Sequence, residues 1–277
     1  MGMLYGVVLG ILIFTLGTVI GSFLNVVIYR TGSGVGYSGR SKCLSCGKML
    51  TAQMLVPLFS FFFQRGRCAY CGTKLSWQYP LVETLSGALF VMVWWVTGFD
   101  PLSSGIKETS FFFLDAAIWM TLLAITVYDL RHKIIPDRFA LCFALLSGLL
   151  LLFRFEQGLL SPYFLTFTGE YIPVWVDLVA GPLLALPFAL LWLFSGGRVM
   201  GLGDAKLAWG IGWFLGFIGG VSAIILAFWT ALIPSLILLF LSRKRFTMKS
   251  EIPFAPFLIL GTLIVFVWNV DILRWVL

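Results

Sequence analysis

The stretch Gly201-Leu202-Gly203-Asp204-Ala205-Lys206 places an aspartate at the start of a long apolar run. The run covers residues 205 to 241 and has no charged residue beyond its first two positions. At 1.5 Å per residue, one straight helix of this length would measure about 55 Å, whereas the hydrocarbon core of a membrane is about 30 Å thick. We therefore expect two helices that fold back on each other, with the turn at Gly216, Gly219 or Gly220.

The composition of the whole chain is that of a membrane protein with several spans. Of its 277 residues, 60% are hydrophobic and 11% are charged, against about 25% charged in ordinary soluble domains. The apolar segments run for roughly 20 residues, which favours helices over a barrel of short alternating strands. We expect an all-α, polytopic membrane protein of about eight transmembrane helices, at residues 4 to 28, 80 to 97, 111 to 128, 138 to 153, 173 to 194, 205 to 217, 220 to 241 and 254 to 269.

The basic residues divide unequally between the two sides that these spans define. The segments 30 to 79, 129 to 138, 195 to 206 and 242 to 252 hold 16 of the 19 Lys and Arg residues. The positive-inside rule therefore predicts an external N-terminus and a cytoplasmic loop at residues 30 to 79. This topology, together with contact with anionic membrane lipid, accounts for most of the net charge of +7, and a partner surface would account for the rest. The sequence contains no motif for nucleic-acid binding.

Four cysteines in this loop form two C-x-x-C pairs, Cys43 with Cys46 and Cys68 with Cys71. Two such pairs can complete a tetrahedral shell of four thiolates with no position open for water, which is typical of structural zinc. The alternatives are disulfides or thiols without metal, but stable disulfides are rare in the cytosol. Metal binding would supply much of the folding energy of this zinc-knuckle loop. With the spans on either side, the loop is expected to form an N-terminal region of residues 1 to 97.

Two aspartates at the ends of different spans are the candidate catalytic pair. Asp129 follows the third span and Asp204 precedes the sixth, both within an expected membrane domain of residues 98 to 277. The topology places both at the cytoplasmic face. Two carboxylates that approach closely do not both ionise easily, so one keeps a proton while the other stays anionic. Such a pair offers an acid and a base that can direct water at a peptide carbonyl.

Each of these acidic residues also has a purely structural interpretation. Asp204 would suit the N-cap of a helix, and Asp129 could be a loop charge paired with Arg131 or Lys133. Glu83 is expected in the first turn of the second span, where either the helix dipole or a substrate could explain it. From the residues alone, both interpretations stay open for each of the three.

The neighbours of Asp204 suggest supporting roles. Gly201 and Gly203 allow a close approach that side chains would block, which suits an extended substrate beside the aspartate. Lys206 could hold the anionic carboxylate or bind a substrate carbonyl or carboxylate. Asp137, after Pro136, is expected to cap the fourth span.

Six motifs together resemble the bacterial type IV prepilin peptidases, the membrane aspartyl proteases that process prepilins and type II secretion pseudopilins. The motifs occur in family order and extend from about residue 20 to 260. They are Gly21-Ser22-Phe23-Leu24-Asn25-Val26, the two C-x-x-C pairs with Arg65-Gly66-Arg67, Tyr79-Pro80-Leu81-Val82-Glu83, Asp129 through Ile134-Ile135-Pro136-Asp137, Gly201 through Lys206, and Ile252-Pro253-Phe254-Ala255-Pro256-Phe257.

The resemblance implies that Asp129 and Asp204 are catalytic and that the enzyme lies in the bacterial inner membrane. It also implies methylation of the new N-terminus by S-adenosylmethionine, for which the sequence shows no glycine-rich nucleotide loop. The substrates implied by the family carry a short basic leader. The zinc-knuckle loop, with seven basic and no acidic residues, should repel such a leader. We therefore expect leader recognition elsewhere, at Glu83, Asp137 or Glu251.

Two other classes of protein share some of these features. A proton-coupled transporter also carries aspartates within its spans, but its carboxylates are expected near the middle of the membrane. A zinc-stabilised membrane assembly or sensor protein would carry the four cysteines and would tolerate loss of either aspartate. The position of both aspartates at one face favours the protease.

Overall fold

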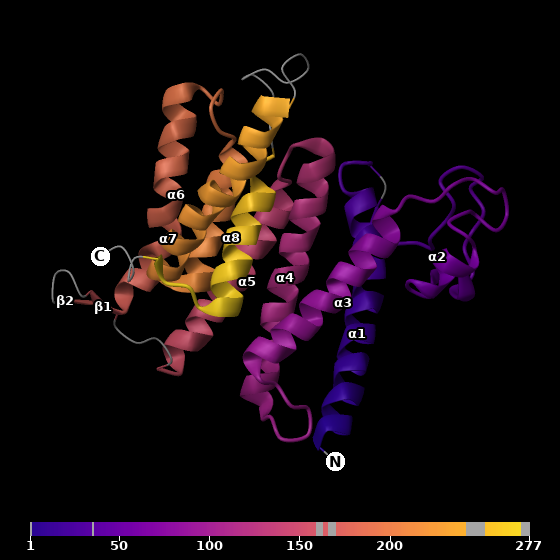
Figure 1. The fold of residues 1–277 in the computed structure, drawn as a ribbon, viewed down its shortest axis with the longest axis horizontal. Helices are drawn as coiled ribbons and strands as arrows, with labels where there is room; N and C mark the ends of the chain where they lie inside the picture. The colour runs from indigo at the N-terminus through magenta and orange to yellow at the C-terminus, as the bar shows by residue number, and fades with distance from the viewer. Residues whose placement is uncertain (1, 35, 159–162, 166–169, 242–252, 273–277) are drawn as a thin grey trace. The chain divides into compact units, whose positions relative to one another are not determined.

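The regular secondary structure of the described chain is almost entirely helical (Figure 1). The computed structural model describes residues 2–34, 36–158, 163–165, 170–241 and 253–272. The main helices are α1 (Gly2–Arg30), α3 (Gln78–Thr97), α4 (Ile106–His132), α5 (Asp137–Glu156), α6 (Trp175–Ser195), α7 (Leu202–Leu241) and α8 (Ala255–Trp268). The shorter elements are a 3₁₀ turn (Ala52–Leu55), α2 (Phe59–Phe63) and an antiparallel pair of three-residue strands, β1 (Tyr163–Leu165) and β2 (Glu170–Ile172).

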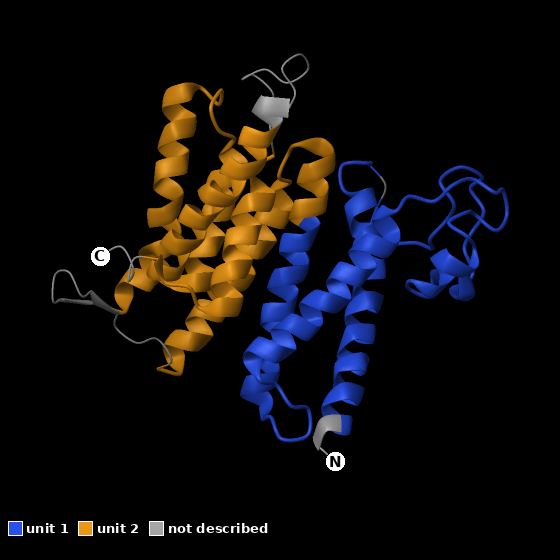
Figure 2. Ribbon diagram, viewed as in Figure 1, with its two compact units in different colours: residues 1–124 blue, residues 125–277 orange. Residues whose placement is uncertain are grey.

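The chain forms two compact units, residues 1–124 and 125–277 (Figure 2). In the first unit α1 packs along α3, with glycines at the closest approaches. A Cβ added to Gly17 would lie 2.8 Å from the Cα of Gly87, so this pairing depends on small residues, as is common between membrane helices. In the second unit α7 packs against α5, α6 and α8.

Six of the described helices are long and apolar enough to cross a membrane, namely α1, α3, α4, α5, α6 and α7. The expected all-helical membrane class is confirmed, but by this criterion the expected count of eight spans is too high. The expected span at 254 to 269 is the 14-residue α8, which at about 21 Å is shorter than a typical hydrocarbon core. The expected spans at 205 to 217 and 220 to 241 are joined within α7.

Helix α7 is not straight, because its backbone is broken at Gly216. This residue has φ 75° and ψ −179°, a conformation that is essentially restricted to glycine. A Cβ added to Gly220 would lie 3.4 Å from the Cα of Gly212, although residues eight positions apart in a straight helix are about 12 Å apart. The second half of α7 therefore returns beside the first, as the length of the apolar run predicts.

A charged pair binds the backbone groups on either side of this break. The Arg154 guanidinium, from α5, donates a hydrogen bond of 2.8 Å to the carbonyl oxygen of Phe214. The N–H of Phe217 donates a bond of 2.8 Å to Asp177 Oδ1, from α6. Asp177 is only 2% exposed and interacts electrostatically with Arg154. Arg154, one of the three Lys and Arg residues outside the four basic segments, thus helps to satisfy polar groups that are costly to bury unpaired.

Breaking this pair is expected to destabilise the second unit. Arg154→Ala and Asp177→Ala each leave a buried charge or N–H without its partner, so each should lower the free energy of unfolding by roughly 3 kcal/mol. Thermal unfolding of the purified protein in detergent measures the loss, and the double variant should lose less than the sum of the two. Glu156→Gln, on the exposed surface of α5, is the control. A loss as large in this control would contradict the prediction.

Candidate functional site

The two candidate catalytic aspartates lie where the ends of α4, α7 and α8 meet in the second unit. Asp129 is in the last turn of α4, and Asp204 is in the first turn of α7. Their carboxyl groups interact electrostatically, so the fold brings together two residues that are far apart in the sequence. Asp129 is 5% exposed and Asp204 is partly buried. Both are therefore largely shielded from bulk water, which strengthens the interaction between them.

Each carboxyl group is held by one backbone N–H group. The N–H of Ala255, at the start of α8, donates to Asp129, and the second carboxyl oxygen of Asp129 is buried with no hydrogen-bond partner among the described residues. The N–H of Gly201 donates to Asp204. Asp129 is thus a buried helix residue and not a loop charge. Asp204 is the third residue of α7 and not its N-cap, although its bond to Gly201 is one half of a capping box.

The contact between Ala255 and Asp129 could not be predicted from the sequence. The motif around Ala255 was part of the family resemblance, but nothing in the residue types indicated a contact with Asp129. Ala255 is fully buried, and Pro256 follows it at the start of α8. An alanine beside a helix-starting proline, in a motif shared with a protease family, was the available signal for an N–H group that binds the carboxyl of a candidate catalytic aspartate.

The two glycines before Asp204 have different surroundings. A Cβ added to Gly203 would lie 3.0 Å from the Cβ of Ile135, whereas one added to Gly201 would have only the Asp204 carboxyl within 3.8 Å. The close approach at Gly203 is therefore to the α4–α5 loop of the same chain. Of the two glycines, only Gly201 keeps the uncrowded surroundings that an extended substrate would need.

Substituting Gly203 is expected to impair the site by pushing this loop away. Gly203→Val should reduce the initial rate of substrate cleavage by at least about tenfold, because its side chain would overlap Ile135. The double variant Gly203→Val with Ile135→Ala should recover part of the rate, since it restores the space. Gly6→Val, at a position in α1 where an added Cβ meets no atom within 4 Å, is the matched control. No rescue by the double variant would contradict this explanation.

Lys206 binds a different carboxylate from the one suggested by its position in the sequence. Its Nζ lies 2.5 Å from Asp137 Oδ1, in an ion pair whose two side chains are 39% and 81% exposed. Asp137 is the first residue of α5, with Pro136 at the N-cap position and no side-chain capping bond. The Lys206–Asp137 pair thus links the start of α7 to the start of α5 at the edge of the site.

Glu83 anchors the cysteine loop within the first unit. It is 6% exposed, and its Oε2 accepts a 2.8 Å hydrogen bond from the N–H of Leu58 and a further bond from Ser22. It is the sixth residue of α3, so it lies beyond the first turn in which we expected it. These contacts join α1, α3 and the loop. Glu251, the third acidic residue considered for leader recognition, lies outside the described residues.

The four loop cysteines form a compact cluster. The Sγ atoms of Cys43, Cys46, Cys68 and Cys71 all lie within 4.8 Å of one another, and none of these cysteines is in a disulfide. The Sγ atoms of Cys43 and Cys71 are 3.9 Å apart. Four thiolates at about 2.3 Å from a tetrahedral zinc ion would be roughly 3.8 Å apart. The donor set and its spacing therefore fit a closed metal site.

The two halves of the cluster have the same backbone structure. In the first knuckle the N–H of Cys43 bonds to the carbonyl of Lys48 and the N–H of Gly47 bonds back to Cys43. In the second knuckle the N–H groups of Cys68 and Gly72 make the equivalent bonds, to Thr73 and Cys68. Both glycines have φ 71°, which suits this tight turn.

Local hydrogen bonds prepare two of the thiols for metal binding. The hydroxyl oxygen of Thr73 lies 3.3 Å from the Cys71 sulfur, and its hydrogen bonds lower the pKa of Cys71 to about 6. The N–H of Cys46 is the main group that lowers the pKa of Cys43. Because thiolates are the species that bind zinc, these bonds favour the metal-binding form.

Arg30, at the end of α1, holds the start of the same loop. Its guanidinium donates to the backbone carbonyl oxygens of five consecutive residues, 36 to 40, over distances of 2.7 to 3.4 Å. The chain therefore wraps around one arginine before it enters the first knuckle. The sequence placed Arg30 at a membrane boundary but held no signal for these contacts, because the acceptors are all backbone groups.

Comparisons with known proteins agree with this arrangement. A family model described as the bacterial peptidase A24 N-terminal domain matches residues 15–97, and one described as the type IV leader peptidase family matches residues 116–239. A prepilin leader peptidase/N-methyltransferase of Legionella pneumophila is 30% identical over 236 residues, which cover 85% of this chain and 75% of that protein. The protein of the same name from Dickeya chrysanthemi is 32% identical over 282 residues, covering 92% and 91%.

No solved structure matches the chain. The second family model includes both aspartates, and the first includes the four cysteines. Since relatives with one shared name align over most of their own length and most of this sequence, the chain belongs to the type IV leader peptidase family.

Proposed function

We propose that this protein is a prepilin leader peptidase, a membrane aspartyl endopeptidase whose catalytic groups are Asp129 and Asp204. The observation that carries the proposal is the interaction of these two carboxyl groups, from α4 and α7, at one end of the second unit. Both residues lie within the segment that matches the type IV leader peptidase family. The proposed substrates are type IV prepilins or type II secretion pseudopilins.

The arrangement supports acid–base attack by water without a covalent intermediate. The anionic carboxyl takes a proton from water as the water oxygen attacks the scissile carbonyl carbon. The protonated carboxyl donates a hydrogen bond to the carbonyl oxygen, and a proton passes to the leaving amine as the C–N bond breaks. One carboxyl oxygen of Asp129 has no hydrogen-bond partner among the described residues, so no protein group competes with a proton that the pair shares. Because the two carboxyls titrate as a pair, we assign neither role to one residue.

The proposed second activity is methylation of the new N-terminus, with S-adenosylmethionine as the methyl donor. It is supported by the names of the relatives, which include N-methyltransferase.

The proposed division of the chain into residues 1–97 and 98–277 separates the cysteine loop from the aspartates. In support of this division, the match to the first family model ends at residue 97 and the match to the second begins at residue 116.

The cysteine cluster is proposed to hold a structural zinc ion through all four thiolates. A closed shell leaves no site for water or substrate, so the ion would stabilise the loop and take no part in peptide cleavage.

We further propose that the protein lies in the bacterial inner membrane, with its N-terminus outside and with both the cysteine loop and the aspartates at the cytoplasmic face. The distribution of Lys and Arg supports this orientation.

Incubation of the purified protein with a prepilin and S-adenosylmethionine tests both activities. Mass spectrometry of the product's N-terminus should show loss of the leader and a gain of one methyl group. An unchanged prepilin would refute the protease activity, and a trimmed but unmethylated product would limit the protein to proteolysis.

A proton-coupled transporter is disfavoured because Asp129 and Asp204 lie in the terminal turns of their helices and not near the middle.

A further inference from the structure

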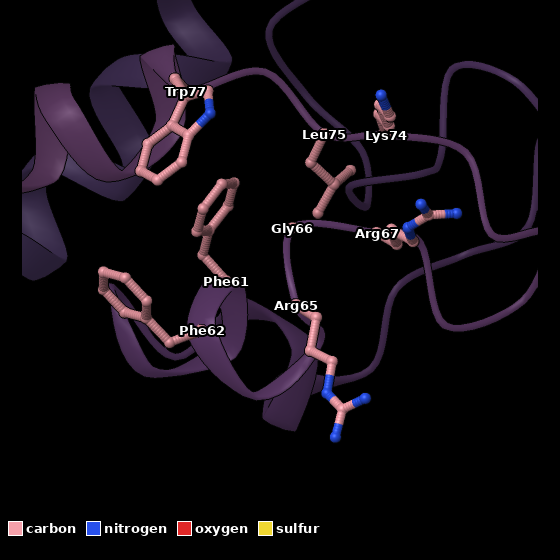
Figure 3. A pocket seen from close by; sticks show the side chains of 8 residues that line it. All are labelled: Phe61, Phe62, Arg65, Gly66, Arg67, Lys74, Leu75 and Trp77. Atoms are coloured by element: carbon pink, nitrogen blue, oxygen red, sulfur yellow. The ribbon is translucent and has the colours of Figure 1, made fainter.

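The cysteine loop contains a pocket that plays no part in the proposed mechanism of peptide cleavage. It has a volume of about 410 Å³, and in Figure 3 aromatic rings lie on one side and basic side chains on the other. Phe61, Phe62, Arg65, Gly66, Arg67, Lys74, Leu75 and Trp77 line it. A pocket with one apolar and one cationic side fits a ligand with an apolar part and an anionic part.

The pocket lies beside the beginning of a membrane span. Trp77 directly precedes α3, and the N–H of Leu58, next to α2, bonds to Glu83, five residues into that helix. At 1.5 Å per residue this bond lies about 7.5 Å along α3 from its first residue. Phe62 and Trp77 are 63% and 72% exposed. Exposed aromatic side chains near the first turns of a membrane span are typical of the aromatic belt at a membrane–water interface.

The basic side of the pocket carries three cationic residues, Arg65, Arg67 and Lys74. Arg67 and Lys74 are directly opposite each other in an isolated antiparallel bridge, a position in which like charges destabilise each other. Arg65 has φ 52°, an unfavourable conformation for a residue other than glycine. All three side chains are exposed, and no ion pair among the described residues includes them. A bound anion would relieve this repulsion.

We propose that this pocket binds the phosphate headgroup of an anionic phospholipid, with Arg65, Arg67 and Lys74 around the phosphate and the apolar part against Phe61 and Trp77. The charge of the pocket argues against the ligands of the two proposed activities. A prepilin leader is basic, and S-adenosylmethionine has a net charge of about +1 from its sulfonium, ammonium and carboxylate groups, so three cations disfavour both. Anionic lipid is present wherever a span meets the inner leaflet, and clustered Lys and Arg beside spans bind it.

The test is titration of the full-length, delipidated protein with phosphatidylglycerol or phosphatidylcholine, followed by native mass spectrometry. Phosphatidylglycerol should bind at least tenfold more tightly. The triple variant Arg65→Gln, Arg67→Gln, Lys74→Gln should lose about fivefold in affinity for each cation removed. Zinc content and proteolytic resistance of the loop, measured in the same samples, establish that the variant is folded.

A matched triple variant controls for the charge of the loop as a whole. Arg40→Gln, Lys42→Gln, Lys48→Gln removes the same number of charges from the same loop, outside the pocket, and should change phosphatidylglycerol affinity less than threefold. Equal losses in the two triple variants would show only diffuse attraction and would overturn the proposal. Inorganic phosphate should bind at least tenfold more weakly than phosphatidylglycerol. Equal binding would identify a site for a soluble anion and would overturn the lipid assignment.

Discussion

Asp129→Asn and Asp204→Asn are each expected to reduce the rate of prepilin cleavage by about 10²- to 10⁴-fold, the usual contribution of general acid–base catalysis. Asparagine keeps the size of aspartate but cannot exchange the proton, so either variant leaves the pair without an acid or without a base. The N–H groups of Ala255 and Gly201 can still bond to the asparagine oxygen, so the site should keep its shape. Initial rates with a purified prepilin measure the effect.

The double variant distinguishes a catalytic pair from two independent residues. If Asp129 and Asp204 act as one unit, replacing both should cost little more than replacing one, because a single loss already disables the pair. Glu156→Gln, an exposed carboxylate-to-amide change in the same unit, should keep the full rate. Wild-type activity in either single variant would refute the mechanism, and losses that multiply in the double variant would refute the pairing.

The sequence was most informative where one physical constraint decided the outcome. The apolar run after Asp204 is too long for one span, so a fold-back was required, and the break occurs at Gly216, the first of the three candidate glycines. Likewise, four cysteines in two C-x-x-C pairs have few arrangements other than a cluster, and the structure brings their sulfur atoms together. The number of spans fell from eight to six because α8 is too short for a complete crossing and because two expected spans are joined within α7.

Contacts between distant residues could not be predicted in the same way. Lys206 is two residues from Asp204 in sequence, but residues two apart on a helix do not face each other, and its partner is Asp137. Glu83 contacts Leu58 and Ser22, which depends on how α1, α3 and the loop pack. Arg154 and Asp177 are separated by 22 residues that give no sign of how the two helices pack. Opposite charges inside apolar segments do suggest an ion pair, but not which residues form it.

Removal of metal is expected to unfold the cysteine loop while the spans remain folded. Among the described residues between α1 and α3, the buried apolar side chains are those of Cys43, Phe61 and Cys68, and two of these three are proposed zinc ligands. So small a core cannot offset the conformational entropy of ordering the loop. Structural zinc binds with about 10–16 kcal/mol in small zinc modules, which is enough to do so.

Two cysteine variants and one control test this prediction. Cys43→Ser and Cys68→Ser should each lose the zinc, which elemental analysis of the purified protein should otherwise find at one ion per chain. Trypsin should then cut the loop at least about tenfold faster, because its seven Lys and Arg residues become accessible in an unfolded segment. Cys142→Ser, in α5 and outside the cluster, should keep both the metal and the resistance.

The alternative states of the cysteines give different results in the same experiment. If the sulfur atoms formed disulfides, the untreated protein would contain no zinc, and a reductant would unfold the loop where a chelator would not. If the thiols were free, neither the reductant nor the chelator would change the rate at which trypsin cuts the loop. The four-thiolate zinc site predicts two results together: zinc in the untreated protein, and cleavage of the loop by trypsin after chelation. Because Glu83 ties this loop to α3 through Leu58, we expect the unfolding to extend to α2 and to stop at the spans.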